Sequence, residues 1–156
     1  MTDTDLYQPD HGPLHAAAEA VELARAASGL VSIDGCRLAD SDPPAPLARD
    51  IARSLTKAGL TVHHCAQHDP LYRLGGMCLL AVPAESGTSH DGVAVSWTVH
   101  NLLRLDWDRY GTYTGTQQTM NIALGGVLRA FGYLVMPFGS GGSWLVTGRR
   151  GTEAGR

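Results

Sequence analysis

Three glycines each separate a segment with helical character from a short β-prone run. Gly29, Gly59 and Gly132 each stand just past the last turn of an expected helix, where a residue in the left-handed conformation is favoured. The runs that follow them comprise residues 30–33, 60–63 and 133–136. Because helix–glycine–strand connections recur along the chain, the sequence predicts a domain that combines helices with a sheet.

The three expected helices differ in how clearly they are marked. The first covers about residues 14–28 and is rich in alanine. The second begins near Pro46, which suits a first helical turn, and its expected apolar face comprises Leu47, Ile51, Leu55 and Ala58. The third covers residues 116–131. Whether it extends backward stays open: Trp107, Tyr110, Tyr113 or Thr114, and Gln117 have helical spacing, whereas Gly111 and Gly115 argue against a helix there. Its apolar stripe comprises Met120, Ala123, Leu124, Val127, Leu128 and Phe131.

Two adjacent glycines, Gly125 and Gly126, interrupt the third expected helix on the side that carries Gln117 and Asn121. A glycine inside a helix costs roughly 1 kcal/mol relative to alanine. A close neighbour would account for that cost, because glycine has no side chain to block the approach. A strand of the same sheet is the plainer interpretation, and a ligand or a second subunit is the alternative.

Four further segments carry strand signals. Residues 92–99 alternate apolar and small polar side chains, as a half-buried strand does, and residues 74–83 precede them. Residues 133–138 and 143–147 flank the turn 139–142, which is glycine-rich and predicts a hairpin. We therefore expect an α+β fold, with an antiparallel or mixed sheet of five to six strands and three helices packed mainly on one face. One domain over residues 14–148 would lie between flexible tails at residues 1–13 and 149–156.

Net charge, apolar runs and cysteine spacing indicate which classes of protein this chain is not expected to belong to. The chain has 156 residues and a net charge of −3, so we expect no general attraction to nucleic acid. The apolar run 77–83 is far shorter than the ~20 residues of a membrane span, and no basic leader precedes an apolar stretch. Cys36, Cys65 and Cys78 form no CxxC pair, which favours reduced thiols and a cytoplasmic location. Lys57 is the only lysine among twelve basic residues, a bias typical of GC-rich bacterial genomes.

The segment 97–113 concentrates aromatic, arginine, histidine and aspartate residues, which combine contact area with hydrogen-bonding groups. The candidate binding residues are Trp97, His100, Asn101, Arg104, Arg109, Tyr110 and Tyr113. In a structural interpretation, Asp106 caps a helix and the aromatic side chains cover the edge of the core. A catalytic interpretation would make His100 a general base oriented by Asp106 or Asp108.

Two other groups of residues resemble ligand sites only in composition. His63, His64, Cys65 and His68 are zinc-ligand types, but their spacing matches no zinc signature. On a strand, His64 would face away from His63 and Cys65. The glycine-rich turn 139–142 has neither the following helix nor the lysine of a phosphate-binding loop. We therefore expect no metal and no cofactor.

Three functions fit these observations, and no family motif decides among them. The first is a small cytoplasmic binding or accessory protein without catalytic activity, with 97–113 as its interaction surface. Its partner would be another protein or a second copy of the chain, and a small ligand is the alternative. The second is a small hydrolase or transferase, with or without a metal, that uses His100 with Asp106 or Asp108. The third is a nucleic-acid-binding protein, which the net charge disfavours. None of the three involves a membrane.

Overall fold

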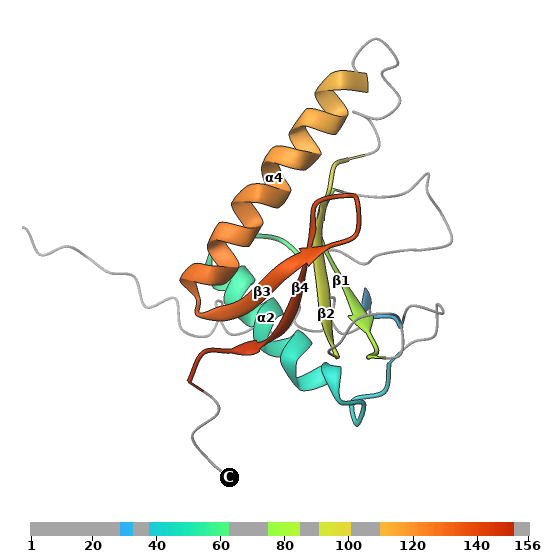
Figure 1. Cartoon of the computed structure of the whole chain (residues 1–156), viewed down its shortest axis with the longest axis vertical. Helices are drawn as coiled ribbons and strands as arrows, with labels where there is room; N and C mark the ends of the chain where they lie inside the picture. The colour runs from blue at the N-terminus through green and yellow to red at the C-terminus, as the bar shows by residue number, and fades with distance from the viewer. Residues whose placement is uncertain (1–28, 33–37, 63–74, 85–90, 101–109, 152–156) are drawn as a thin grey trace, which may run out of the picture.

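The computed structural model describes residues 29–32, 38–62, 75–84, 91–100 and 110–151. Within them, two helices accompany a four-stranded antiparallel sheet of order β1-β2-β4-β3 (Figure 1). The elements are α2 (Pro44–Lys57), β1 (Gly76–Val82), β2 (Gly92–Thr98), α4 (Tyr110–Ala130), β3 (Tyr133–Phe138) and β4 (Ser143–Arg149). The expected α+β class and antiparallel pairing are confirmed. The expected helix at residues 14–28 lies outside the described residues.

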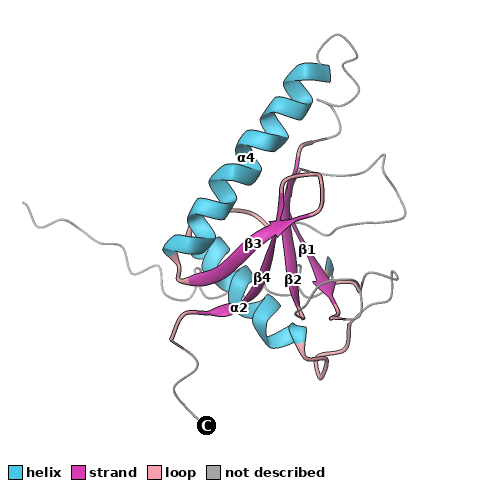
Figure 2. Ribbon diagram, in the orientation of Figure 1, coloured by secondary structure: helices cyan, strands magenta, loops and turns pink. Residues whose placement is uncertain are grey.

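Both helices pack on the same face of the sheet (Figure 2). Ile51 and Leu55 of α2 and Leu124 and Leu128 of α4 share one buried cluster with the sheet. The sheet contributes Met77, Leu79, Val93, Val95, Tyr133 and Val146. Full burial of a leucine or isoleucine side chain contributes roughly 1.5–3 kcal/mol, so this cluster holds the two layers together. A smaller cluster on the other face comprises Val82, Ala94 and Leu145.

The expectation of five to six strands is not matched in the described part of the chain. The segments that follow Gly29 and Gly59 make only isolated parallel bridges to the outer edge of β1. These bridges pair Val31 with Leu80 and Val62 with Met77. Each segment accepts one backbone hydrogen bond from β1, of 2.9 Å and 3.1 Å respectively. In their described residues, both β-prone segments therefore make a short contact along the edge of β1 and not a ladder.

Helix α2 begins at Pro44, two residues before the expected start, and Ala58 lies beyond its last residue and is exposed. The buried residues of α2 are Ala45, Ala48, Ile51, Ala52, Ser54 and Leu55. Leu47 is only partly buried. The buried face is therefore richer in alanine than the expected face, which lets this helix approach the sheet closely.

Helix α4 extends backward to Tyr110, so Gly111 and Gly115 do not end it. The expected apolar stripe is also rotated. Asn121, Leu124, Gly125 and Leu128 are buried, whereas Ala123 is exposed. Met120, Val127 and Phe131 are only partly buried. The helix turns a polar residue and a glycine toward the sheet because both make specific contacts there.

Gly125 accommodates the indole ring of Trp144 on β4. A β-carbon built on Gly125 would lie 2.6 Å from the Nε1 atom of Trp144, well inside contact distance. A β-carbon on Gly126 would meet nothing within 4 Å. The interpretation that a strand of the same sheet approaches these glycines is therefore confirmed for Gly125 but not for Gly126.

Two observations concern the state of Cys78 and the ability of the described helices to cross a membrane. Cys78 is disulfide-bonded, so the expectation of reduced thiols is wrong for this residue. The two other cysteines, Cys36 and Cys65, lie outside the described residues. The Thr98 hydroxyl donates to the Sγ atom of Cys78 at 3.5 Å, because a disulfide sulfur has no hydrogen to give. No helix in the described ranges combines the length and the apolar character that a membrane crossing requires.

We predict that Gly125→Ala and Gly126→Ala change stability in opposite directions. The first substitution forces the added methyl group against the Trp144 ring, which should cost about 1–3 kcal/mol. The second meets open space and gains up to about 1 kcal/mol of helix propensity. Urea unfolding of both variants measures the difference, and equal effects would contradict the packing of Trp144 on Gly125.

We also predict that one of the three cysteines is a free thiol in the purified protein. Alkylation of the denatured chain without reductant should label a single cysteine, and labelling after reduction should reach all three. Mass spectrometry of the labelled peptides identifies the residues. Labelling of Cys78 before reduction would show that it is not in a disulfide.

Candidate functional site

The side chain of Asn121 on α4 joins three parts of the fold. Its Oδ1 atom accepts the backbone N–H of Trp97 at 2.7 Å, and its Nδ2 group donates to the Gly141 carbonyl at 3.2 Å. Asn121 is only 1% exposed. Strand β2 pairs with β4 from Val93 to Val95, so the Trp97 amide lies beyond this pairing. Asn121 therefore accepts this amide in place of a strand.

Trp144 fixes the same region of α4 from the other side. Its Nε1–H donates to the backbone carbonyl of Asn121 at 2.6 Å. The Arg129 guanidinium lies over the indole ring, with its Cζ atom 4.4 Å from the ring centroid. A cation over a tryptophan face contributes about 0.5–1 kcal/mol at an exposed site. The ring is thereby held against Gly125, and the strand that follows the β3–β4 turn is tied to α4.

A cleft of about 340 Å³ lies between α4 and the β3–β4 turn, close to Asn121. Its described lining comprises Thr114, Gln117, Gln118, Ser140, Gly141 and Gly142. Gly139 and Gly142 have φ angles of +65° and +77°, so the turn has a shape that side-chain-bearing residues rarely adopt. In Figure 1 this turn reaches up beside α4, and the N-terminal end of the helix extends past it.

The described lining of the cleft carries no titratable side chain. It presents amides, hydroxyl groups and glycine backbone, all of which form hydrogen bonds without a charge. The Oε1 atom of Gln117 is buried and has no hydrogen-bond partner among the described residues. A buried acceptor without a donor costs about 1–3 kcal/mol. The described lining thus provides neutral hydrogen-bonding groups, and Gln117 keeps one buried acceptor with no donor among the described residues.

The two ends of the candidate binding segment 97–113 lie on either side of this region. Trp97 is tied to Asn121 at one end, and its partly buried side chain packs against the core. At the other end, Tyr110 and Tyr113 lie in the first turns of α4, and Tyr113 directly precedes the cleft-lining Thr114. His100 is exposed, and its backbone lies beside Gly75 rather than in the cleft.

The remaining candidate residues are not placed by the structure. Asn101, Arg104, Asp106, Asp108 and Arg109 lie outside the described residues, and so do all four candidate metal ligands: His63, His64, Cys65 and His68. Of Tyr110 and Tyr113, only the backbone is described. Among the residues that are described, no three histidine, cysteine, aspartate or glutamate side chains gather as a metal site would require.

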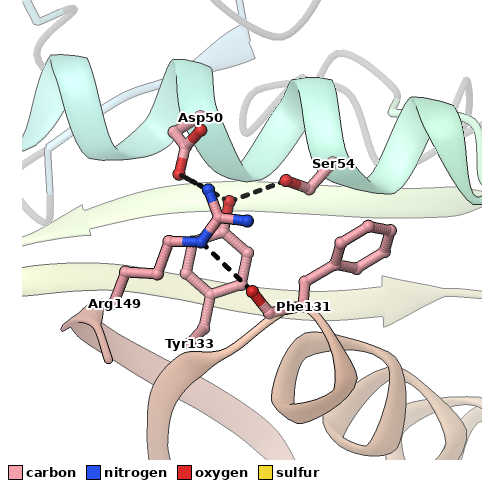
Figure 3. Close-up of polar contacts among 5 residues, drawn as sticks. All are labelled: Asp50, Ser54, Phe131, Tyr133 and Arg149. Atoms are coloured by element: carbon pink, nitrogen blue, oxygen red, sulfur yellow. Dashed lines mark hydrogen bonds and ion pairs between the residues drawn. The ribbon is translucent and has the colours of Figure 1, made fainter. Parts of the chain in front are cut away.

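A second polar cluster connects α2 to the β3–β4 hairpin (Figure 3). The Tyr133 hydroxyl donates to the Asp50 carboxylate at 2.8 Å and lies 2.9 Å from the Ser54 hydroxyl. Arg149 forms an ion pair with the same Asp50 oxygen at 3.2 Å and donates to the Phe131 carbonyl at 3.1 Å. Its Cζ atom lies 5.1 Å from the Tyr133 ring centroid. Tyr133 is 1% exposed and the Asp50–Arg149 ion pair is partly exposed; together these residues tie α2 to the hairpin.

Sequence reasoning identified parts of the cleft separately, but it did not bring them together. Gln117 and Asn121 stood out by their spacing of four residues, and the turn 139–142 by its glycines. Nothing in the pattern placed the turn beside that helix. The cluster around Tyr133 gave no sequence signal, because Asp50 and Ser54 precede Tyr133 by 83 and 79 residues.

Comparison of the chain with protein-family models, with curated proteins and with solved structures finds no match. The function must therefore be inferred from the geometry of the chain itself. The cleft beside Asn121 is the described feature that combines space, hydrogen-bonding groups and the predicted binding segment.

We predict that ionisation of Tyr133 weakens the fold at high pH. Burial, and to a lesser extent the hydrogen bond to Asp50, raise the pKa of Tyr133 from the ordinary value of about 10 to about 12. Because the folded pKa is the higher one, this stabilisation is complete below pH 10 and is lost as the pH rises toward 12.

The test is the free energy of unfolding of the wild type and of Tyr133→Phe as a function of pH. The variant should lose about 1–2 kcal/mol at neutral pH, since two hydrogen bonds disappear. It should also show a smaller decline between pH 10 and 12. A decline identical to that of the wild type would mean that Tyr133 does not titrate in this range.

Proposed function

We propose that this protein is a small, non-catalytic binding protein whose recognition site is the cleft between α4 and the β3–β4 turn. Both described ends of the segment 97–113 lie near this site, because Trp97 bonds to Asn121 and Tyr110–Tyr113 begin α4. The observation that carries the proposal is the position of Asn121, which ties Trp97 and Gly141 to one side chain. The beginning of the segment, the helix that follows it and the glycine turn therefore meet at one place.

The uncharged lining supports binding more than catalysis. General acid–base catalysis needs a group whose pKa lies near the working pH, and nucleophilic catalysis needs an activated side chain. The described lining offers neither, because it consists of threonine, glutamine, serine and glycine. A volume of about 340 Å³ lies at the small end of ligand pockets, which span roughly 300–1,000 Å³.

The chemistry of the lining indicates what it recognises. Gln117 offers an acceptor without a partner among the described residues. A neutral donor such as an amide N–H or an alcohol O–H would satisfy it, whereas an anion would bring a further acceptor. An amide of a partner protein and a free neutral molecule present the same groups, so both fit the proposed accessory role.

We predict that neutral donors bind at this cleft and that simple anions do not. The 15N-labelled protein is titrated separately with N-acetylglycinamide, glucose, acetate and inorganic phosphate. The amide or the sugar should shift the NMR signals of the Gln117 side chain and of the Gly141 and Gly142 amides. Binding of the amide indicates a protein group as the natural ligand, and binding of glucose indicates a polyol.

Two variants locate the effect. Gln117→Leu removes the acceptor and should abolish the shifts, while Ile122→Ser changes an exposed residue of α4 outside the lining and should preserve them. The proposal is contradicted if phosphate or acetate shifts these signals as strongly as the neutral probes. It is equally contradicted if no neutral probe shifts them at solubility-limited concentrations.

A further inference from the structure

The two edges of the sheet differ in the backbone hydrogen bonds that they make with other described segments. At the outer edge of β1, the amides of Met77 and Ala81 donate to the carbonyls of Thr61 and Val31. At the opposite edge, β3 has β4 as its only hydrogen-bonded strand neighbour among the described residues. An uncovered strand edge presents unpaired backbone groups to any strand that can approach it.

Strand β3 also carries two of the exposed large apolar side chains. Leu134 is 43% exposed and Met136 is 39% exposed. They are two residues apart and therefore lie on the same face of the strand. That face is opposite the helices, because Met136 pairs with Leu145 of the smaller core cluster. The six residues of β3 include no charge, and Pro137 is the one residue of a type that usually protects an edge strand.

The proline of β3 indicates which backbone groups face the open edge. Proline has no N–H, so within a sheet it is placed where that group would point away from the neighbouring strand. Pro137 therefore directs its nitrogen away from β4. Val135 and Tyr133 share its orientation, because backbone groups alternate along β3 and the extra residue at the register shift between Leu134 and Val135 lies on β4. The open edge thus offers the N–H groups of Tyr133 and Val135 and three carbonyls.

We propose that two copies of this chain associate by pairing β3 with β3 in antiparallel orientation about a two-fold axis at Val135. Val135 and the partner's Val135 would exchange two backbone hydrogen bonds. The Tyr133 amide would donate to the carbonyl of the partner's Pro137, and the partner's Tyr133 amide would donate to the Pro137 carbonyl. With the two bonds at Val135, the strand pair would have four backbone hydrogen bonds. The two sheets then form one continuous sheet of eight strands.

This register matches the exposed side chains to each other. It sets Leu134 directly opposite the partner's Met136, and the symmetry repeats the pair. Directly opposite residues in an antiparallel pair have Cβ atoms about 4.5–5.5 Å apart, so both exposed pairs become contacts. A two-fold interface must be complementary to itself, and an uncharged strand with apolar residues at mirrored positions meets that requirement.

The size of the contact sets its strength. A six-residue strand pair buries less than the roughly 800 Å² per partner of a stable interface. We therefore expect a reversible dimer that forms in the micromolar range and not a permanent one. Each chain has a net charge of −3, but β3 has no charged residue. The paired strands therefore place no like charges opposite each other.

Sedimentation velocity of the full chain, from low micromolar to near-millimolar concentration, tests the proposal. The wild type should shift from monomer to dimer as concentration rises. Leu134→Lys/Met136→Lys sets lysine opposite lysine and should remain monomeric throughout. Leu134→Lys/Met136→Glu sets lysine opposite glutamate and should recover a dimer that weakens with salt. Ile122→Lys is the matched control, since Ile122 is 64% exposed on α4, and it should dimerise like the wild type.

Every substituted side chain is exposed, so circular dichroism should show all variants folded. A wild type that stays monomeric at the highest concentration overturns the proposal. So does a lysine–lysine variant that dimerises like the wild type, or a lysine–glutamate variant that is as monomeric as the lysine–lysine one. Loss of the dimer in Ile122→Lys alone would move the interface to α4. None of these results depends on whether the cleft binds a ligand.

Discussion

The amide side chain of Asn121 satisfies two backbone groups that the sheet leaves without a strand partner. It accepts the Trp97 amide, which lies beyond the pairing of β2 with β4, and it donates to the Gly141 carbonyl in the turn. An unpaired buried backbone group would cost about 1–3 kcal/mol, so the orientation of α4 is fixed by polar geometry as well as by apolar contact. Gly125 follows from the same requirement, because the helix must come close enough for Trp144 to reach the Asn121 carbonyl.

The hairpin of β3 and β4 is the element to which both helices are tied. Trp144 joins it to α4, and Tyr133 with Arg149 joins it to Asp50 of α2 (Figure 3). The two ties differ in character. The first is a tryptophan against a glycine, and the second is a buried hydroxyl that bridges an ion pair and a serine. Together they orient the two helices on one face by specific contacts.

The sequence predicted the elements better than their contacts. The alternation of apolar and polar residues and the turn glycines predicted both ends of each of the four strands to within about two residues, because those signals are local. The face of α4 was predicted by counting apolar residues, which assigned Ala123 to the core and left Asn121 beside it. The structure reverses the two, because three hydrogen bonds to Asn121 depend on Trp97, Gly141 and Trp144. No local pattern records partners about twenty residues away. For the same reason the cleft could be anticipated only as separate parts.

The proposed cleft and the proposed interface use different parts of the same hairpin. The cleft takes the turn at Gly141 and Gly142, and the interface takes the middle of β3 at Val135. Antiparallel pairing about Val135 would point the two turns in opposite directions. At about 3.3 Å per residue, each turn would lie roughly 20 Å from the axis. The two clefts would then be separated by roughly 40 Å and remain open. Such a dimer would be bivalent, and a partner that presents two matching groups would bind more tightly than either cleft binds alone.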